Sequence, residues 1–258
     1  MQPARGRRMS YYRQGPHRSW GGGGLRIGTP ELTPMVRAII IACTAVWVLQ
    51  FALYLADFAI EPWLGLVPFA VFHGFVWQPL TYMFLHQASD PFHLLFNMLM
   101  LWMFGGELER FWGSRRFLRF YLICGLGAGL ITVLFNGLVL PRAARLATVG
   151  ASGAIYGLFV AYGVIFAERI VLFMMLFPMR ARTMAWVMMA VTFCSTLAQP
   201  LGGVAHIAHL GGGLVGYLLV KRAWRLRELW ASLRWSLRRR RFKVMPRSGF
   251  DDRDRWVN

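Results

Sequence analysis

Six apolar stretches follow one another between residues 36 and 221 of this sequence. They lie at residues 36–56, 92–106, 117–137, 150–167, 183–199 and 204–221. Hydrophobic residues account for 57% of the chain and charged residues for 16%, whereas soluble domains have about 45–50% and about 25%. Because lipid offers no hydrogen-bond partners to backbone N–H and C=O groups, such stretches cross a membrane as helices. We therefore expect an all-α polytopic membrane protein with six transmembrane helices.

A seventh apolar stretch, Trp63–Leu85, is interrupted by proline, histidine and glutamine, and the distribution of basic residues argues against a span there. With six spans, 27 of the 29 Lys and Arg residues lie on the side of the N-terminus, and only Arg142 and Arg145 lie on the other side. A seventh span would move the basic C-terminal segment to the outer side, against the positive-inside rule. We predict a multi-pass protein of the cell (inner) membrane with both termini in the cytoplasm, and a partly embedded outer loop at residues 57–91.

Two basic tails flank the predicted six-helix core at residues 35–221. Residues 1–34 are rich in Arg, Gly and Pro and predict a disordered cytoplasmic tail. Residues 222–258 place Trp and Leu at near-helical spacing among many arginines, which is typical of an amphipathic helix on the anionic cytoplasmic leaflet. Nucleic-acid binding is the alternative for so basic a tail, but no recognition module accompanies it, so we expect no nucleic-acid partner.

The three cysteines, Cys43, Cys124 and Cys194, each lie in an apolar stretch and lack the spacing of metal ligands. They indicate neither a disulfide framework nor a zinc site. The sequence suggests no metal and no cofactor.

A serine between small residues, in Gly150-Ala151-Ser152-Gly153, stands at the head of an apolar helix. The helix N-terminus offers free N–H groups and the positive end of the dipole, which favour an oxyanion formed beside the serine. The glycines leave room for a peptide backbone to approach, and Tyr156 lies one turn further on the same face. The alternative is that these small residues only allow close helix packing, as is common in membranes.

Two histidines in the last apolar stretch, His206 and His209, share a helix face, so that either can meet Ser152. An ionisable residue at bilayer depth is a functional-site hypothesis by default. Gly212 and Gly216 follow on the side of His209 and predict tight packing against the serine helix, whose own small strip is Gly153 and Gly157. We favour His209 as the base of a serine–histidine pair and a structural role for His206.

His93 and Asn97 lie one helical turn apart on a third helix and face the same way. Their N–H groups suit an oxyanion hole, although the pair alone is also compatible with a hydrogen-bonded clamp between helices. All eleven acidic residues lie in loops, in tails or at span ends. This distribution favours a Ser-His dyad over a Ser-His-Asp triad.

Over residues 36–221 these motifs resemble the rhomboid family of intramembrane serine proteases. The matching motifs are His-x-x-x-Asn at His93 and Asn97, Gly-x-Ser-Gly at Ser152, Ala-His-x-Gly-Gly at His209, the run Thr81–His86, and Gly106–Glu109 followed by Gly113-Ser114.

The resemblance implies a rhomboid-like six-helix bundle with Ser152 as nucleophile and His209 as general base. It further implies an oxyanion hole formed by His93, Asn97 and the backbone N–H of Ser152, with Tyr156 packed under the histidine and Gly150 supporting the serine. The implied substrates are transmembrane proteins whose spanning segment unwinds easily. Many relatives carry Trp-Arg in the first loop, where this chain has Trp77-Gln78.

Two other functions are compatible with a polytopic chain of this kind. A catalytically inactive rhomboid-like protein would hold membrane clients without cutting them, but the retained Ser152 and His209 argue against it. A transporter would use the histidines as a proton relay, but no inverted repeat with broken helices is evident.

Overall fold

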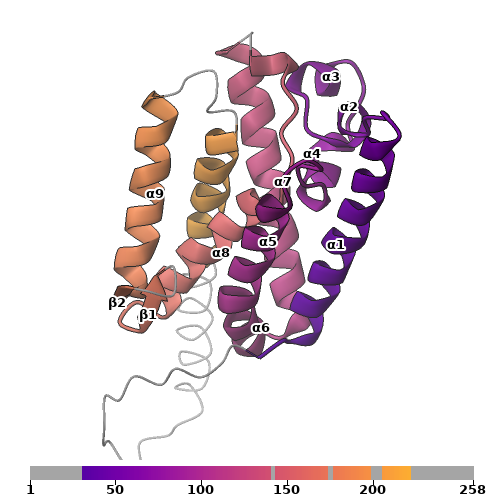
Figure 1. Ribbon diagram of the computed structural model, residues 1–258. Coiled ribbons are helices and arrows are strands. Elements are labelled where there is room, and N and C mark those ends of the chain that lie inside the picture. The colour runs from indigo at the N-terminus through magenta and orange to yellow at the C-terminus, as the bar shows by residue number, and fades with distance from the viewer. Residues whose placement is uncertain (1–30, 141–142, 174–176, 199–204, 222–258) are drawn as a thin grey trace, which may run out of the picture.

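The computed structural model describes residues 31–140, 143–173, 177–198 and 205–221, and these residues are mostly helical (Figure 1). Every apolar stretch predicted as a span coincides with a helix. These helices are α1 (Pro34–Leu55), α5 (Pro91–Met100) continued by the π-helical η2 (Leu101–Gly105) and by α6 (Gly106–Trp112), α7 (Ser114–Leu138), α8 (Ser152–Ile165), α9 (Ala181–Ala198) and a helix at residues 205–221.

Three of these helices, α1, α7 and α9, are long and apolar enough to cross a membrane. Helix α8 has 14 residues, which gives a length of about 21 Å at 1.5 Å per residue. It is therefore too short to cross a hydrocarbon core of about 30 Å by itself. Most of the predicted tails, residues 1–30 and 222–258, lie outside the described residues, and so does Arg142.

The predicted outer loop folds into short helices and not into a seventh span. These are α2 (Glu61–Leu64), α3 (Pro68–Phe72), α4 (Gln78–Thr81) and the 3-10 turn η1 (Tyr82–Phe84). Each of α2, α3 and α4 has a proline in its first turn, a position that tolerates the missing N–H but that ends any preceding helix.

One glutamine holds this loop together from inside. The fully buried Gln78 accepts a hydrogen bond from the backbone N–H of Val67 (3.0 Å) and donates to the carbonyl groups of Pro62 (2.9 Å) and Trp63 (3.4 Å). Trp77 donates to the Trp63 carbonyl as well (2.9 Å). A neutral side chain thus binds the backbone of this loop directly.

The segment after α8 forms a β-hairpin that the sequence analysis did not predict. Strands β1 (Ile170–Phe173) and β2 (Phe177–Arg180) pair antiparallel. Glu107 of α6 fastens the hairpin to the bundle, because it forms an ion pair with Arg169 and accepts a hydrogen bond from the Tyr162 hydroxyl (2.6 Å). The hairpin lies at the end of the bundle where α1 begins and toward which the helix at residues 205–221 runs (Figure 1).

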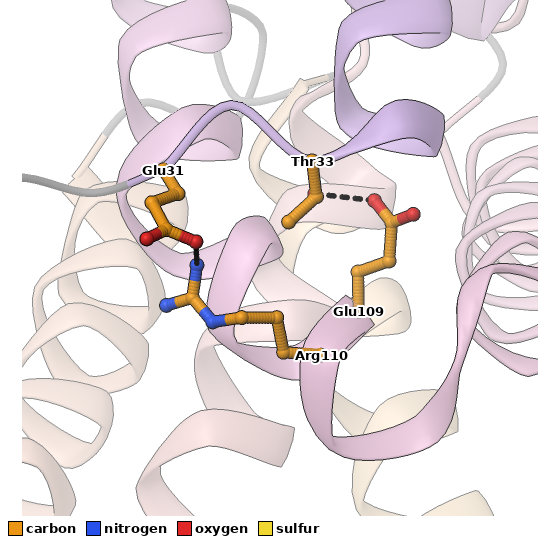
Figure 2. Close-up of polar contacts among 4 residues, drawn as sticks. All are labelled: Glu31, Thr33, Glu109 and Arg110. Atoms are coloured by element: carbon orange, nitrogen blue, oxygen red, sulfur yellow. Dashed lines mark hydrogen bonds and ion pairs between the residues drawn. The ribbon is translucent and has the colours of Figure 1, made fainter.

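At the same end, the Glu109 carboxylate binds the first turn of α1, and Figure 2 shows this carboxylate beside Thr33. It accepts hydrogen bonds from the Thr33 hydroxyl and from the backbone N–H groups of Met35 (3.0 Å) and Val36 (2.9 Å). The Ser114 hydroxyl donates to its other side (2.6 Å). Because the first N–H groups of a helix have no partner within the helix, Glu109 completes α1 and joins it to α6 and α7.

Candidate active site

Ser152 and His209 meet inside the bundle. Ser152 is the first residue of α8, and His209 lies on the helix at residues 205–221. The distance between Ser152 Oγ and His209 Nε2 is 2.7 Å, the length of a good hydrogen bond to a hydroxyl. This is the arrangement in which an imidazole can take the proton of an attacking serine.

Glycines allow this approach, as the sequence predicted. A Cβ atom placed on Gly212 would lie 1.8 Å from the Gly153 carbonyl oxygen, and one placed on Gly216 would lie 2.6 Å from the Gly157 carbonyl oxygen. The two helices therefore touch backbone to backbone along two successive turns. Such contact is the use that membrane helices make of small residues.

The ring of Tyr156 supports the histidine from one side. It is stacked on the His209 ring, with centroids 4.3 Å apart and an interplanar angle of 5°. Tyr156 follows Ser152 by one helical turn, so the two residues of α8 that meet His209 share one face of this helix. Within the described residues, no hydrogen bond joins His209 to an acidic side chain, and this geometry fits a dyad.

His206 does not bind Ser152. Its ring lies 6.1 Å from the ring of His209, centroid to centroid. Its buried Nδ1 has no hydrogen-bond partner in the part of the chain that the structure describes. Of the two candidates for the base, the geometry therefore selects His209.

His93 lies next to Gly150, which precedes the serine by two residues. A Cβ atom on Gly150 would lie 3.0 Å from His93 Nε2 and 3.6 Å from Ser152 Oγ. The backbone N–H of Gln87 donates to His93 Nδ1 (3.3 Å). Because Nδ1 accepts a hydrogen bond, the ring proton of the neutral imidazole belongs on Nε2, the atom that lies next to Gly150.

Gly150 itself adopts a backbone conformation with φ +127°, which side-chain-bearing residues rarely reach. Its N–H donates to the Tyr82 carbonyl (3.0 Å). This turn directs the chain into α8, and the missing side chain leaves the space that the His93 ring occupies. The sequence predicted room for a substrate backbone at this glycine, but neither the positive φ nor the contact with the His93 ring.

Asn97 is buried one turn after His93. Its amide nitrogen donates to the His93 carbonyl (2.7 Å), so one of its two amide hydrogens is used within α5. The other remains available on the same face as His93, since the amide group has two donors.

An open cavity of about 950 Å³ joins these groups. Ser152, His209, His93, Asn97 and Tyr156 all lie along its wall, which is otherwise mainly apolar. Among the described residues, no group of three or more His, Cys, Asp or Glu side chains is placed to hold a metal ion. The cavity wall carries a candidate nucleophile, a candidate base and hydrogen-bond donors, which are the groups that an acyl-transfer reaction requires.

Comparisons with known proteins agree with these motifs. A family model described as "Rhomboid domain" matches residues 73–225. The chain is 33% identical over 170 residues to "Rhomboid protein 1, mitochondrial" of Saccharomyces cerevisiae, which covers 59% of this chain and 45% of the relative. It is 34% identical over 147 residues to "RHOMBOID-like protein 1" of Arabidopsis thaliana, with coverage of 56% and 33%.

A third relative is called "Rhomboid protease GlpG" and comes from Yersinia pestis. It is 25% identical over 190 residues, which cover 72% of this chain and 61% of the relative. The chain thus spans between a third and about three fifths of the length of the curated relatives that it matches.

Proposed function

This chain belongs to the rhomboid family, whose domain covers more than half of it, and from this premise we propose that it is an intramembrane serine endopeptidase. The single observation that carries the proposal is the 2.7 Å contact between Ser152 Oγ and His209 Nε2 at the wall of an open cavity. Family membership and the apolar helices support an integral membrane protein.

In the proposed reaction, Ser152 Oγ attacks the carbonyl carbon of a peptide bond while His209 Nε2 takes the serine proton. The oxyanion that forms is held by His93 Nε2–H, the Asn97 amide and the backbone N–H of Ser152. His209 then gives its proton to the leaving amine as the C–N bond breaks. Water attacks the resulting ester by the same steps in reverse, which frees the acid product and Ser152.

The proposed topology is a six-helix bundle in the cell (inner) membrane with both chain ends in the cytoplasm. It is supported by the apolar helices of the described residues and by the common end at which α1 begins and toward which the helix at residues 205–221 runs. The proposed substrates are transmembrane proteins, because a peptide must reach a serine that lies inside the bundle. Anionic lipid is proposed as a partner of the basic segment 222–258.

The test uses the purified full-length protein and its Ser152→Ala variant, each incubated in lipid vesicles with a panel of single-span proteins. Mass spectrometry of the products should find cleavage within or next to a spanning segment with the wild type only. Absence of cleavage, together with tight retention of intact clients, would instead favour the inactive client-binding protein. Cleavage that survives Ser152→Ala would refute the assignment of the nucleophile.

A further inference from the structure

One hydrogen bond connects the tyrosine beneath His209 to a helix that contributes nothing else polar to the site. Thr192 of α9 is buried, with 3% of its surface exposed. Its hydroxyl donates to the Tyr156 hydroxyl over 2.8 Å. The other buried residues of α9 are Ala181, Met184 and Ala185, so Thr192 is the one buried hydroxyl of the described helix.

We propose that Thr192 is a positioning residue, which sets the orientation of His209 through the Tyr156 ring. The inference rests on the proposed function, since it concerns the serine–histidine pair of that reaction. Thr192 lies outside the sequence motifs around His93, Ser152 and His209.

The geometry shows how a hydroxyl on α9 reaches the histidine. Tyr156 is held at its ring face by the parallel stack with His209 and at its edge by Phe159, with centroids 5.7 Å apart and planes at 63°. The Tyr156 hydroxyl lies at the end of the ring farthest from the backbone. A displacement of this hydroxyl out of the ring plane would therefore tilt the whole ring. The hydrogen bond from Thr192 holds the hydroxyl in place, and this keeps the tyrosine ring parallel to the imidazole of His209.

His209 needs such support because, among the residues that the structure describes, no carboxylate bonds to it. In Ser-His-Asp triads an acid bonded to the second ring nitrogen holds the imidazole in place. Here the stacked ring of Tyr156 orients the imidazole instead. Thr192, which lies on a third helix, holds the Tyr156 ring in its position.

The alternative is that the bond merely holds α9 against α8. Those helices are already in close contact two turns away, where a Cβ atom on Gly163 would lie 2.6 Å from the Ala185 Cβ. A helical threonine can satisfy its hydroxyl on the carbonyl four residues earlier, as Thr196 does on the Thr192 carbonyl (2.8 Å). Thr192 instead bonds across the interface to Tyr156.

The test measures kcat and KM for cleavage of one single-span substrate by full-length variants. The variants are Thr192→Val, Thr192→Ser, Tyr156→Phe and the double variant Thr192→Val/Tyr156→Phe, with Thr196→Val as the matched control on the same helix. Labelling of Ser152 by a fluorophosphonate, followed in parallel, reports on the nucleophile without a peptide substrate.

Because one hydrogen bond is worth about 0.5–1.5 kcal/mol, Thr192→Val should lower kcat by roughly 3- to 10-fold and slow labelling alike, with KM within about twofold. Thr192→Ser should restore most of the activity. Tyr156→Phe removes the same bond from its other end, so the double variant should be no slower than the slower single variant. Thr196→Val should match the wild type.

Two results would overturn the inference while the proposed function stands. One is full kcat in Thr192→Val, and the other is independent, multiplicative losses in the double variant. If Thr192→Val does not fold, Tyr156→Phe and Thr192→Ser decide the question, because equal kcat of wild type and Tyr156→Phe would show that the bond has no role. A wild type that neither cleaves nor is labelled at Ser152 would refute the proposed function itself.

Discussion

Gly212 rests directly on the carbonyl of Gly153, so closely that a Cβ atom on Gly212 would lie 1.8 Å from the oxygen and 2.7 Å from the carbonyl carbon. The two residues lie next to the proposed dyad, since Gly153 follows Ser152 and Gly212 is one turn from His209. The distance between nucleophile and base is therefore set by the absence of a side chain at Gly212.

Gly212→Ala should abolish or nearly abolish cleavage. The atoms that an added methyl group would meet belong to the backbone of α8 and cannot rotate away, so the helices must separate by more than 1 Å. Displacements of this size at a catalytic pair can cost about 10²-fold in rate. Turnover of a single-span substrate and fluorophosphonate labelling of Ser152 should both fall.

Gly211→Ala is the matched control, because the nearest atoms to a Cβ there belong to the side chain of Ile131, at 3.2 Å, and not to a backbone. This variant should keep most of its activity. Equal loss in both variants, in proteins that remain folded, would show that the backbone contact at Gly212 is not what places the dyad.

His209→Ala should remove activity as completely as Ser152→Ala, whereas His206→Ala should leave most of it. Of these two histidines, His209 is the one whose ring nitrogen is hydrogen-bonded to the serine oxygen, and loss of a nucleophile or base can cost on the order of 10⁶ in turnover. The comparison is made by initial cleavage rates at equal amounts of folded protein. An active His209→Ala together with an inactive His206→Ala would reverse the choice of base.

Asn97→Ala should weaken cleavage less than Ser152→Ala does. Loss of one oxyanion donor commonly costs about 10²–10³ in kcat, and His93 and the Ser152 N–H remain. Because the Asn97 amide also bonds to the His93 carbonyl, thermal unfolding must accompany the kinetics. A folded Asn97→Ala variant as inactive as Ser152→Ala would contradict this graded role.

The helical fold and the pairing of Ser152 with His209 could be predicted because each depends on a local pattern. The apolar helices follow from apolar length, and the small strips of Gly153 and Gly212 indicated which faces would touch. The same glycines favoured His209 over His206, since Gly212 and Gly216 lie on the face of the helix that carries His209 and that face was expected to pack against the serine helix.

Long-range hydrogen bonds of single side chains could not be predicted in the same way. Gln78 gives no signal in the sequence that it binds Pro62, Trp63 and Val67, and Thr192 looks no different from Thr196 in an apolar helix. The β-hairpin was missed because its strands have only four residues each, too few for a clear alternation. In all these cases the partner is chosen by tertiary packing and not by local periodicity.

Gln78→Ala should destabilise the outer loop, since it removes the hydrogen-bond partner of the Val67 N–H and of the Pro62 carbonyl, whereas the Trp63 carbonyl keeps its bond from Trp77. Buried polar groups left unpaired cost about 1–3 kcal/mol. A lower thermal unfolding midpoint in detergent and faster proteolysis between residues 61 and 81 are expected. Gln87→Ala, at an exposed glutamine, serves as the control, and equal midpoints of the two variants would contradict the anchoring role.

The last prediction concerns Glu109, which lies beyond the predicted span 92–106. Burial raises the pKa of its carboxyl, but the hydrogen bonds from Ser114, Thr33 and the backbone N–H groups of Met35 and Val36 together hold the pKa below its usual range. A carboxyl with a lowered pKa stabilises the folded state fully above its unfolded pKa of about 4.3. This contribution is lost as the pH falls through the lower, folded pKa.

Glu109→Gln should therefore lower the unfolding midpoint at pH 7, because an amide cannot accept all of these hydrogen bonds. The difference between wild type and variant should shrink as the pH is lowered from about 5 toward 3, since the wild-type carboxylate becomes protonated there. Glu31→Gln is the control: Glu31 pairs with Arg110 at 3.4 Å with 79% of its side chain exposed, and such surface pairs contribute little. A wild-type advantage over Glu109→Gln that stays constant down to pH 3 would show that the charge of Glu109 does not stabilise the start of α1.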